Sequence, residues 1–242
     1  MYNLLIATTS CKKYLSTRVN AIKNSWNYNG IYKNFKITHL FFIGGNDEKQ
    51  ENDLITLKCR DDYCSLSGKT YSVLKYINDN FNFDYLIKTN DDSYVNIEKF
   101  CDSNFENYDY GGYCCINTDM DVLQQTDFAQ GGFYFLSCKS TEYILNTEGE
   151  LSLLNNLNSS IEDQNIGRIM AQKNNLKFLK LNNFPKIDMP FHICEEGMSI
   201  HPVHHTLMRE LYTNKNHFNK QLSILKYKSF TSDYGIRRTI KK

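Results

Sequence analysis

Two adjacent carboxylates, Asp91 and Asp92, are the residues best placed to do chemistry. They follow an apolar run, 85–87 (YLI), and an extended segment, 93–95 (SYV), comes directly after them. Carboxylates on a tight turn at a strand end present oxygen to a hard divalent cation that bridges phosphates. The same residues also suit a solvated turn, where Asn and Asp are common. The remainder of the chain decides between a metal site and a plain turn.

The first part of the sequence alternates between strand and helix patterns. Near-continuous apolar runs predict buried strands, and apolar residues spaced by three and four predict helices. The strand patterns lie over 4–8, 37–43 and 85–87, and the helix patterns over 15–27 and 66–81. This β-α-β-α-β order predicts a parallel, doubly wound sheet. Ligands bind at the carboxyl ends of strands in such sheets, which is where Asp91 and Asp92 fall.

The second half has a different pattern. Short strands are expected to begin at two glycine pairs, 111–112 and 131–132. A helix is expected over 161–174, with an inner face made of Ile161, Ile166, Ile169 and Met170. No repeat or Gly-, Ser- or Pro-rich linker interrupts the chain, which predicts a single domain over 1–242. The basic tail suits a solvated terminus, and an anionic partner is the alternative.

The composition excludes several classes of protein. The 242 residues hold 28 Lys and Arg against 27 Asp and Glu, so no overall field favours nucleic acid or an anionic membrane. With 41% hydrophobic and 14% aromatic residues, the chain can bury a sizeable core. No transmembrane segment and no signal peptide stands out. We therefore expect a cytoplasmic protein, in the host cytoplasm if it is viral, and the Golgi lumen only if an N-terminal anchor was removed.

The 8 cysteines show no C-x-x-C spacing of the kind that zinc sites use. In a secreted protein, Cys59 with Cys64, or Cys114 or Cys115 with Cys194, would suit disulfides. Without a secretion signal, free thiols are the expectation.

Five segments, in order, resemble motifs of one family, the inverting β-1,3-glycosyltransferases (glycosyltransferase family 31) that include the galactosyltransferases, fringe and core 1 synthase. The third segment, 88–95 (KTNDDSYV), resembles that family's metal motif Lys-Thr-Asp-Asp-Asp-x-Phe/Tyr-Val, and 162–167 (EDQNIG) resembles its Glu-Asp-x-x-x-Gly motif. The other three are 17–26, 62–70 and 131–137, and a sixth, 197–201 (GMSIH), resembles a Ser-Phe-His motif of the fringe and core 1 synthase branch.

The resemblance implies the glycosyltransferase A fold, a Rossmann-like mixed α/β sheet flanked by helices. It divides the single domain into a nucleotide-sugar-binding half over about 1–95, an acceptor half over about 96–215 and the basic tail over 216–242. Asp92 matches the carboxylate that ligates a metal ion, with Mn²⁺ or another divalent cation expected, and His201 matches the histidine that completes the protein ligands. Three further histidines lie close in sequence and offer alternatives: His192, His204 and His205.

The resemblance also implies a catalytic base, because an inverting transfer needs a group that takes the proton of the acceptor hydroxyl. Asp163 matches that base. The alternative for Asp163 is a first-turn carboxylate that stabilises a helix, and one residue can fill both roles. Among the donor-binding candidates, Asp91 is either a structural residue or a contact to the donor sugar. Asn90 stands where the family has an aspartate that faces the nucleotide ribose.

The remaining candidates surround the expected donor site. Thr8 and Thr9 end the first strand and are expected to face the uracil. Arg18 is expected to neutralise phosphate and Lys69 to support the donor pocket, with plain surface charges as the alternative for both. Gly131 and Gly132 would let the chain approach the sugar, although a strained turn explains them equally.

Together these residues predict a metal-dependent inverting enzyme that moves a hexose from a UDP-sugar to a hydroxyl of a glycan or glycoprotein acceptor, with a β-1,3 linkage expected. One alternative is a catalytically inactive carbohydrate- or nucleotide-binding module on the same fold, which Asn90 would suit. A second is a nucleotidyltransferase, which the absence of a Gly-rich triphosphate loop disfavours.

Overall fold

The computed structural model describes residues 1–116, 127–147, 161–181, 192–193 and 199–201. Of the two short strands near the end of this set, at 192–193 and 199–201, only the backbone is described. His204, His205, Cys194 and the basic tail lie outside the described residues.

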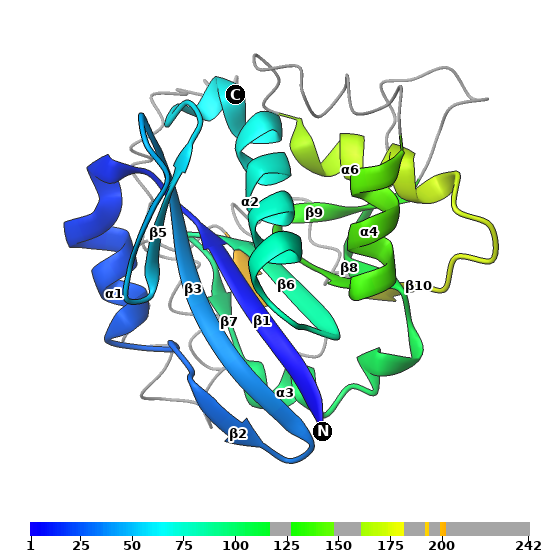
Figure 1. Cartoon of the computed structure of the whole chain (residues 1–242). Helices are drawn as coiled ribbons and strands as arrows, with labels where there is room; N and C mark the ends of the chain where they lie inside the picture. The colour runs from blue at the N-terminus through cyan, green and yellow to red at the C-terminus, as the bar shows by residue number, and fades with distance from the viewer. Residues whose placement is uncertain (117–126, 148–160, 182–191, 194–198, 202–242) are drawn as a thin grey trace, which may run out of the picture.

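A mixed sheet of nine strands forms the centre of the molecule, in the order β10-β8-β9-β6-β1-β3-β5-β4 with β2 paired to β3 (Figure 1). The neighbours β5, β3, β1 and β6 run parallel, whereas β9 is antiparallel to β6. The strands are β1 Tyr2–Thr9, β2 Gly30–Tyr32, β3 Phe35–Gly45, β4 Lys49–Glu51, β5 Leu54–Lys58, β6 Tyr85–Asn90, β8 Tyr110–Ile116, β9 Asp127–Ser137 and β10 Phe178–Leu181. The predicted Rossmann-like mixed sheet is confirmed, and its strands come from both predicted halves of the chain.

A second, small sheet has the order β11-β12-β7, and all of its neighbours are antiparallel. Its strands are β7 Tyr94–Val95, β11 His192–Ile193 and β12 Ser199–His201. Because β7 starts two residues after Asp92, this sheet attaches the segment around 200 directly beside the carboxylate pair.

Helices cover both faces of the large sheet, and Figure 1 shows α2, α4 and α6 together on one face. The helical segments are η1 Lys12–Tyr14, η2 Leu15–Val19, α1 Asn20–Lys23, η3 Tyr63–Ser65, α2 Leu66–Asn80, α3 Ile97–Cys101, η4 Phe105–Asn107, α4 Cys138–Asn146 and α6 Glu162–Ala171. Of these, η2 is a π-helix and η1, η3 and η4 are 3₁₀-helices.

Strict alternation along the strands produces two separate apolar cores, one on each face of the sheet. Leu4, Ile6 and Ile87 pack with α1 and α3, whereas Leu5 and Leu86 pack with α2, α4 and α6. The alternation also determines on which face the polar residues at the strand ends lie. Even-numbered positions of β6 face α6 and odd-numbered positions face α1, so different side chains lie on the two faces at the carboxyl end of this strand.

Three expectations about elements are wrong in detail. The predicted helix over 15–27 is a π-helical turn followed by a single α-helical turn that ends at Lys23. Beyond it, Ser25 Oγ donates to Ala21 O at 2.7 Å, and this side-chain hydrogen bond competes with the backbone hydrogen bond that would continue the helix. Ile161 is 44% exposed and precedes α6 instead of lining its inner face. The glycine pairs lie inside β8 and β9 and do not begin them.

Cys11, Cys59, Cys64, Cys101 and Cys138 are free thiols. The Cys59–Cys64 pairing is therefore not formed, and the other suggested pairing involves residues whose side chains the structure does not describe.

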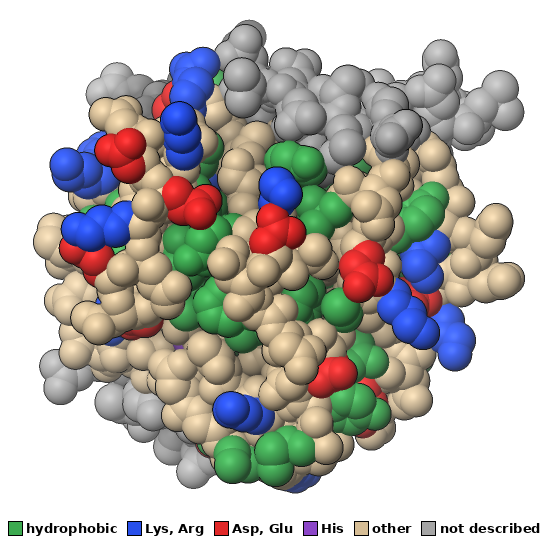
Figure 2. Space-filling model, viewed as in Figure 1, with side chains coloured by type: hydrophobic (Ala, Val, Ile, Leu, Met, Phe, Trp, Pro, Cys, Tyr) green, Lys and Arg blue, Asp and Glu red, His purple; other side chains and the backbone are tan. Residues whose placement is uncertain are grey.

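No helix among the described residues is long and apolar enough to cross a membrane. On the face shown in Figure 2, acidic and basic side chains are interspersed and do not gather into a single patch of one sign.

The inner face of α6 can be tested against its exposed flank. Ile169 is fully buried, so Ile169→Ala should lower the free energy of unfolding by about 2–5 kcal/mol. Ile161→Ala makes the same kind of truncation at an exposed position and should change it by less than about 0.5 kcal/mol. Urea denaturation of both variants checks this, and equal costs would show that Ile161 packs in the core.

Candidate active site

A cleft of about 230 Å³ opens at the carboxyl ends of β1 and β6. Its walls come from three places in the chain: the segment after β1, the loop before α2, and the end of β6. The lining residues are Thr9, Ser10, Cys11, Lys13, Tyr14, Arg18, Asp61, Asp62, Tyr63, Leu66, Lys69, Asn90, Asp91 and Asp92. The cleft thus lies at the strand ends where a doubly wound sheet binds ligands.

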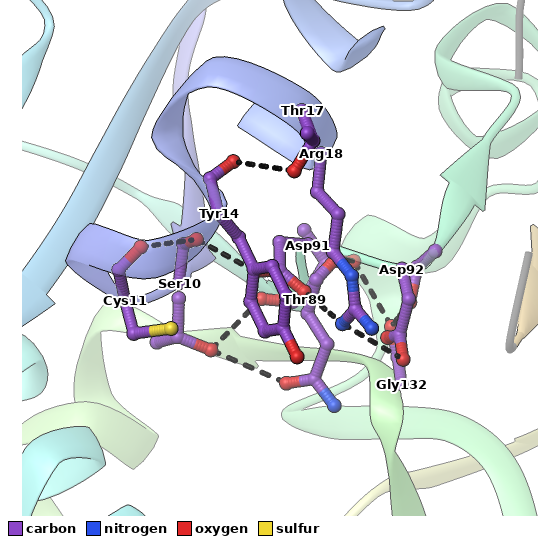
Figure 3. Close-up of polar contacts among 12 residues, drawn as sticks. Ser10, Cys11, Tyr14, Thr17, Arg18, Thr89, Asp91, Asp92 and Gly132 are labelled. Carbon is purple, nitrogen blue, oxygen red and sulfur yellow. Dashed lines mark hydrogen bonds and ion pairs between the residues drawn. The ribbon is translucent and has the colours of Figure 1, made fainter. Parts of the chain in front are cut away.

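Asp91 is held by contacts to both of its carboxylate oxygens (Figure 3). Arg18 Nη1 donates to Oδ1 at 2.9 Å, and Ser10 Oγ donates to Oδ2 at 2.6 Å. The Asp91 backbone N–H donates to Thr9 O at 3.1 Å and fixes the turn to β1. Burial and the charge of Asp92 raise the pKa of Asp91, and Arg18 opposes that rise. Both carboxylate oxygens of Asp91 therefore accept a hydrogen bond within the protein, while the residue still lines the cleft.

Arg18 lies between the two carboxylates, with Nη1 at 3.6 Å from Asp92 Oδ2. The aromatic ring of Tyr14 stacks on its guanidinium, 3.9 Å from the ring centroid, as Figure 3 shows. A guanidinium held by a ring and a carboxylate keeps a fixed orientation in the cleft wall. The sequence expectation for Arg18 as a site residue agrees with its place in the cleft wall, whereas the surface-charge alternative does not, because Arg18 is 8% exposed.

Asp92 is the carboxylate of the pair that lies in the cleft without being tied to Ser10. Its side chain is buried, and β7 follows directly after it. Ile200 pairs with Tyr94 in the antiparallel register, so the backbone of His201, the next residue along β12, continues toward Ser93 and Asp92. Among the side chains that the structure describes, no three His, Cys, Asp or Glu ligands come together. One or two protein oxygens are nevertheless enough for a cation that takes its other ligands from phosphate and water, so this donor set fits a hard divalent ion.

Asn90 has its amide orientation fixed by a cation. Lys88 Nζ lies 2.8 Å from Asn90 Oδ1, and Thr9 Oγ1 donates to the same oxygen at 3.2 Å. An ammonium only donates, so the oxygen of the amide must face Lys88 and Thr9. The amide NH₂ therefore points away from both, and a family aspartate at this position would present a second acceptor oxygen instead.

Asp163, in the first turn of α6, reaches the sheet through Gly131. Its Oδ2 accepts a hydrogen bond from Gly131 N at 2.9 Å, and its Oδ1 accepts from Gln164 N at 2.9 Å. Burial and the charges of Asp163, Glu162 and Asp92, in that order, raise the pKa of Tyr63, which lines the cleft. The charges of both Asp92 and Asp163 therefore act on Tyr63 in the cleft wall.

Four of the expected donor-site residues have other contacts. Thr8 is fully buried, and its Oγ1 lies 2.7 Å from His39 Nε2 beneath the stacked ring of Trp26, so it is not in the cleft. Strand alternation explains this, because Thr9 and not Thr8 faces the cleft side. Lys69 lines the cleft, but its Nζ donates to Asp61 Oδ1 at 2.7 Å and to Ser10 O at 2.9 Å.

Gly131 and Gly132 sit in β9 with ordinary strand backbone, so the strained-turn alternative does not hold. A Cβ on Gly131 would lie 2.8 Å from Glu162 Oε2, which shows that the glycine admits the buried acid of α6. The Gly132 carbonyl accepts hydrogen bonds from Thr89 Oγ1 at 2.9 Å and Ser93 Oγ at 2.7 Å.

Sequence reasoning missed the residues that join these parts. They are Tyr14, Asp61, Lys88, Tyr134 and Glu162. Lys88 and Glu162 both lie inside motifs quoted above. A lysine in the middle of an apolar strand pattern is expected to be buried, and a buried ammonium needs a counter-charge, so the position of Lys88 could have pointed to Glu162.

The comparison with protein families covers the part of this site that comes from the first half of the chain. Residues 17–110 match the model of the galactosyltransferase family. This segment is less than half of the chain, and over it the chain is similar to that family. The galactosyltransferase segment contains Arg18, Lys69 and the Asn90-Asp91-Asp92 turn, and it ends before Gly131, Asp163 and His201. Together with the mixed sheet it supports glycosyl transfer as the class of reaction, with a sugar donor and a glycan acceptor.

No curated protein matches the whole chain significantly. Among solved structures, partial likeness is found to the galactosyltransferase LgtC in complex with donor and acceptor sugar analogs (12% identity, 68% of this chain and 68% of that chain, TM-score 0.41). A197 from STIV (12% identity, 83% and 93%, TM-score 0.35) and HddC from Yersinia pseudotuberculosis (13% identity, 59% and 79%, TM-score 0.30) are also similar in part.

The buried histidine behind the cleft predicts a pH dependence of stability. Burial, and secondarily Lys23, lowers the pKa of His39 from 6.5 to about 3. The unfolded chain therefore binds a proton below about pH 6.5 that the folded protein refuses until about pH 3. Stability should be fully present above pH 6.5 and fall as the pH drops, by up to about 1.4 kcal/mol per pH unit.

The check compares the unfolding free energy of the wild type and His39→Gln between pH 7 and pH 4, where glutamine keeps a polar partner for Thr8 but does not titrate. The wild type should have the steeper loss. Parallel curves would mean that His39 is protonated in the folded protein.

Proposed function

We propose that this protein is a metal-dependent inverting glycosyltransferase that transfers a hexose from a UDP-sugar to an acceptor hydroxyl, with a β-1,3 linkage. The observation that carries the proposal is the arrangement at the end of β6. Asp92, Asn90 and Arg18 line one cleft, and the carboxylate of Asp163 is tied to Gly131 on the neighbouring strand β9. A cation that binds phosphate, and a base held nearby, are the two parts that such a transfer needs.

The protein groups around the cleft suit a nucleoside diphosphate. The guanidinium of Arg18, oriented by Tyr14 and Asp91, offers hydrogen bonds to phosphate oxygens. The NH₂ of Asn90 offers a donor to an oxygen of the ribose. Thr9 and Ser10 bring the end of β1 to the same wall, with the Ser10 carbonyl fixed by Lys69.

Asp92, together with His201 from β12, would hold the divalent ion. When bound, such an ion stabilises the negative charge of the departing diphosphate. Arg18 supplies one positive charge against two carboxylates, at 2.9 Å from Asp91 and 3.6 Å from Asp92, so it does not balance the negative charge of the pair by itself.

Asp163 is proposed as the base. It would take the proton of the acceptor hydroxyl while that oxygen forms the new bond to the anomeric carbon and the bond to the diphosphate breaks. The hydrogen bonds from Gly131 N and Gln164 N fix the plane of the carboxylate. A base held in place contributes about 10²–10⁴-fold to such a reaction.

The metal site is tested with two isosteric variants of opposite charge. Asp92→Asn removes one negative charge from the turn, and Asn90→Asp adds one. Thermal melting with UDP should show a Mn²⁺-dependent rise in midpoint for the wild type that is lost in Asp92→Asn. Asn90→Asp should not tighten Mn²⁺ binding, because its carboxylate would lie against the Lys88–Glu162 pair, where a second negative charge is disfavoured.

A UDP-induced rise that is independent of Mn²⁺, and equal in Asp92→Asn, would contradict the proposed metal ligand. Melting with GDP- and CMP-linked sugars serves as the control for nucleotide specificity, and no rise with any nucleotide would favour a carbohydrate-binding module.

The base is tested with Asp163→Asn, which keeps the size of the side chain. We expect kcat for transfer, or for slow hydrolysis of the UDP-sugar, to fall by about 10²–10⁴-fold while UDP affinity in calorimetry stays the same. If Asp163→Asn retains kcat, Asp163 is only a first-turn carboxylate of α6. If the wild type binds UDP-sugar with Mn²⁺ but never turns it over, the inactive binding module is the better description.

A further inference from the structure

Lys88 is a fully buried ammonium in the middle of β6. Its Nζ contacts one group from each of three elements: Asn90 Oδ1 at 2.8 Å on its own strand, Gly131 O at 3.0 Å on β9, and Glu162 Oε1 at 2.7 Å on α6. It lies on the α6 side of the sheet, below the cleft and outside its lining. Lys88 therefore cannot touch a ligand in that cleft, but it touches the groups that hold both ends of the site.

Glu162 is the counter-charge, and it is as deeply buried as Lys88, with 1% exposure. The Tyr134 hydroxyl donates to Glu162 Oε1 at 3.2 Å. Burial raises the pKa of Glu162, and Lys88 opposes that rise. Glu162 also precedes Asp163 on the first turn of α6, so fixing one fixes the backbone that carries the other.

The peptide of Gly131 joins Lys88 to Asp163 directly. Its carbonyl accepts from Lys88 Nζ at 3.0 Å, and its N–H donates to Asp163 Oδ2 at 2.9 Å. The absent side chain of Gly131 makes room for Glu162, since a Cβ there would meet Glu162 Oε2 at 2.8 Å. Two routes, one through Glu162 and one through Gly131, thus lead from the same ammonium to Asp163.

We propose that Lys88 is the positioning residue of the active site, which sets Asp163 relative to the Asn90-Asp91-Asp92 turn through Glu162 and the Gly131 peptide. The inference rests on the proposed function for its catalytic consequence. Its geometric content, that Lys88 determines where the Asp163 carboxylate lies against Gly131, is independent of any reaction.

A purely structural role predicts something different. Buried ion pairs are often replaced by apolar residues of similar volume with no loss of stability, whereas removal of one partner leaves a costly unpaired charge. A variant that removes both charges and the hydroxyl therefore separates the two roles. Such a variant should restore the fold but not the placement of Asp163.

The experiment compares Lys88→Met, the apolar triple variant Lys88→Met/Glu162→Met/Tyr134→Phe, and the control Lys75→Met. The control makes the same substitution in an ion pair with Asp79 on the exposed face of α2. In the triple variant we expect a melting midpoint near that of the wild type and kcat about 100-fold lower, because the base is displaced. Mn²⁺-dependent UDP affinity should fall by less than kcat, because Asn90 loses one of the two hydrogen bonds that orient its amide. Lys75→Met should match the wild type in all three.

Nuclear magnetic resonance supplies a readout that needs no turnover. The Gly131 N–H donates to Asp163 Oδ2 at 2.9 Å, so the Gly131 amide shift should change when Asp163→Asn removes the charge of its acceptor. In the triple variant the Gly131 amide should move and exchange faster with solvent. If Asp163→Asn leaves the Gly131 amide shift unchanged, the inference is wrong even when the other variants fail to fold.

The outcomes for the two proposals differ. A triple variant that keeps both kcat and the Gly131 amide shift overturns the role of Lys88 and leaves the transferase proposal intact. A wild type that turns over no UDP-sugar overturns the transferase proposal, and the Gly131 comparison then decides the role of Lys88 alone.

Discussion

The site depends on the burial of two adjacent carboxylates at the end of one strand. Asp91 and Asp92 are 6% and 7% exposed, and desolvation of an ionised carboxylate costs several kcal/mol unless partners compensate it. Arg18 and Ser10 supply that compensation for Asp91 at 2.9 and 2.6 Å. The irregular helical turn over Leu15–Val19 is what brings Arg18 down to the turn, and Tyr14 stacks on the opposite side of its guanidinium. Asp92, the next residue, is also buried but lines the cleft.

Because side chains alternate along β6, the two faces of the sheet carry different parts of the site. Asp91 continues the odd-numbered positions and meets Arg18 on the α1 side, whereas Lys88 and Asn90 occupy even-numbered positions on the α6 side. One face therefore stabilises the carboxylate turn, and the other connects that turn to Gly131, Glu162 and Asp163. Because both sets belong to one strand, a shift of β6 by a single residue would exchange them and destroy both halves of the site.

The sequence predicted well where a pattern is local. Apolar runs located β1 and β3, and the spacing of three and four located α2, since burial against a sheet is visible in single segments. It failed where the deciding partner is distant. Thr8 was expected at the donor site, but its hydroxyl pairs with His39 on β3, two residues before its register partner Phe41, and only the pairing of β1 with β3 shows this. The place of Ile161 depends on where α6 begins, which apolar spacing does not fix.

Lys88 and Asn90 show that sequence reasoning also fails for charged and polar residues whose partners are distant in the sequence. Taken alone, an asparagine in place of the family's aspartate suggests a damaged metal motif. In the folded protein the ammonium of Lys88 is already balanced by Glu162 at 2.7 Å, both of them out of contact with water. An aspartate at position 90 would set a second carboxylate against that one ammonium in a region of low dielectric, and like charges so close disfavour ionisation of both. The amide supplies the oxygen that Lys88 needs without the extra charge. Asn90 therefore joins the buried Lys88–Glu162 pair to the cleft wall without adding a third charge.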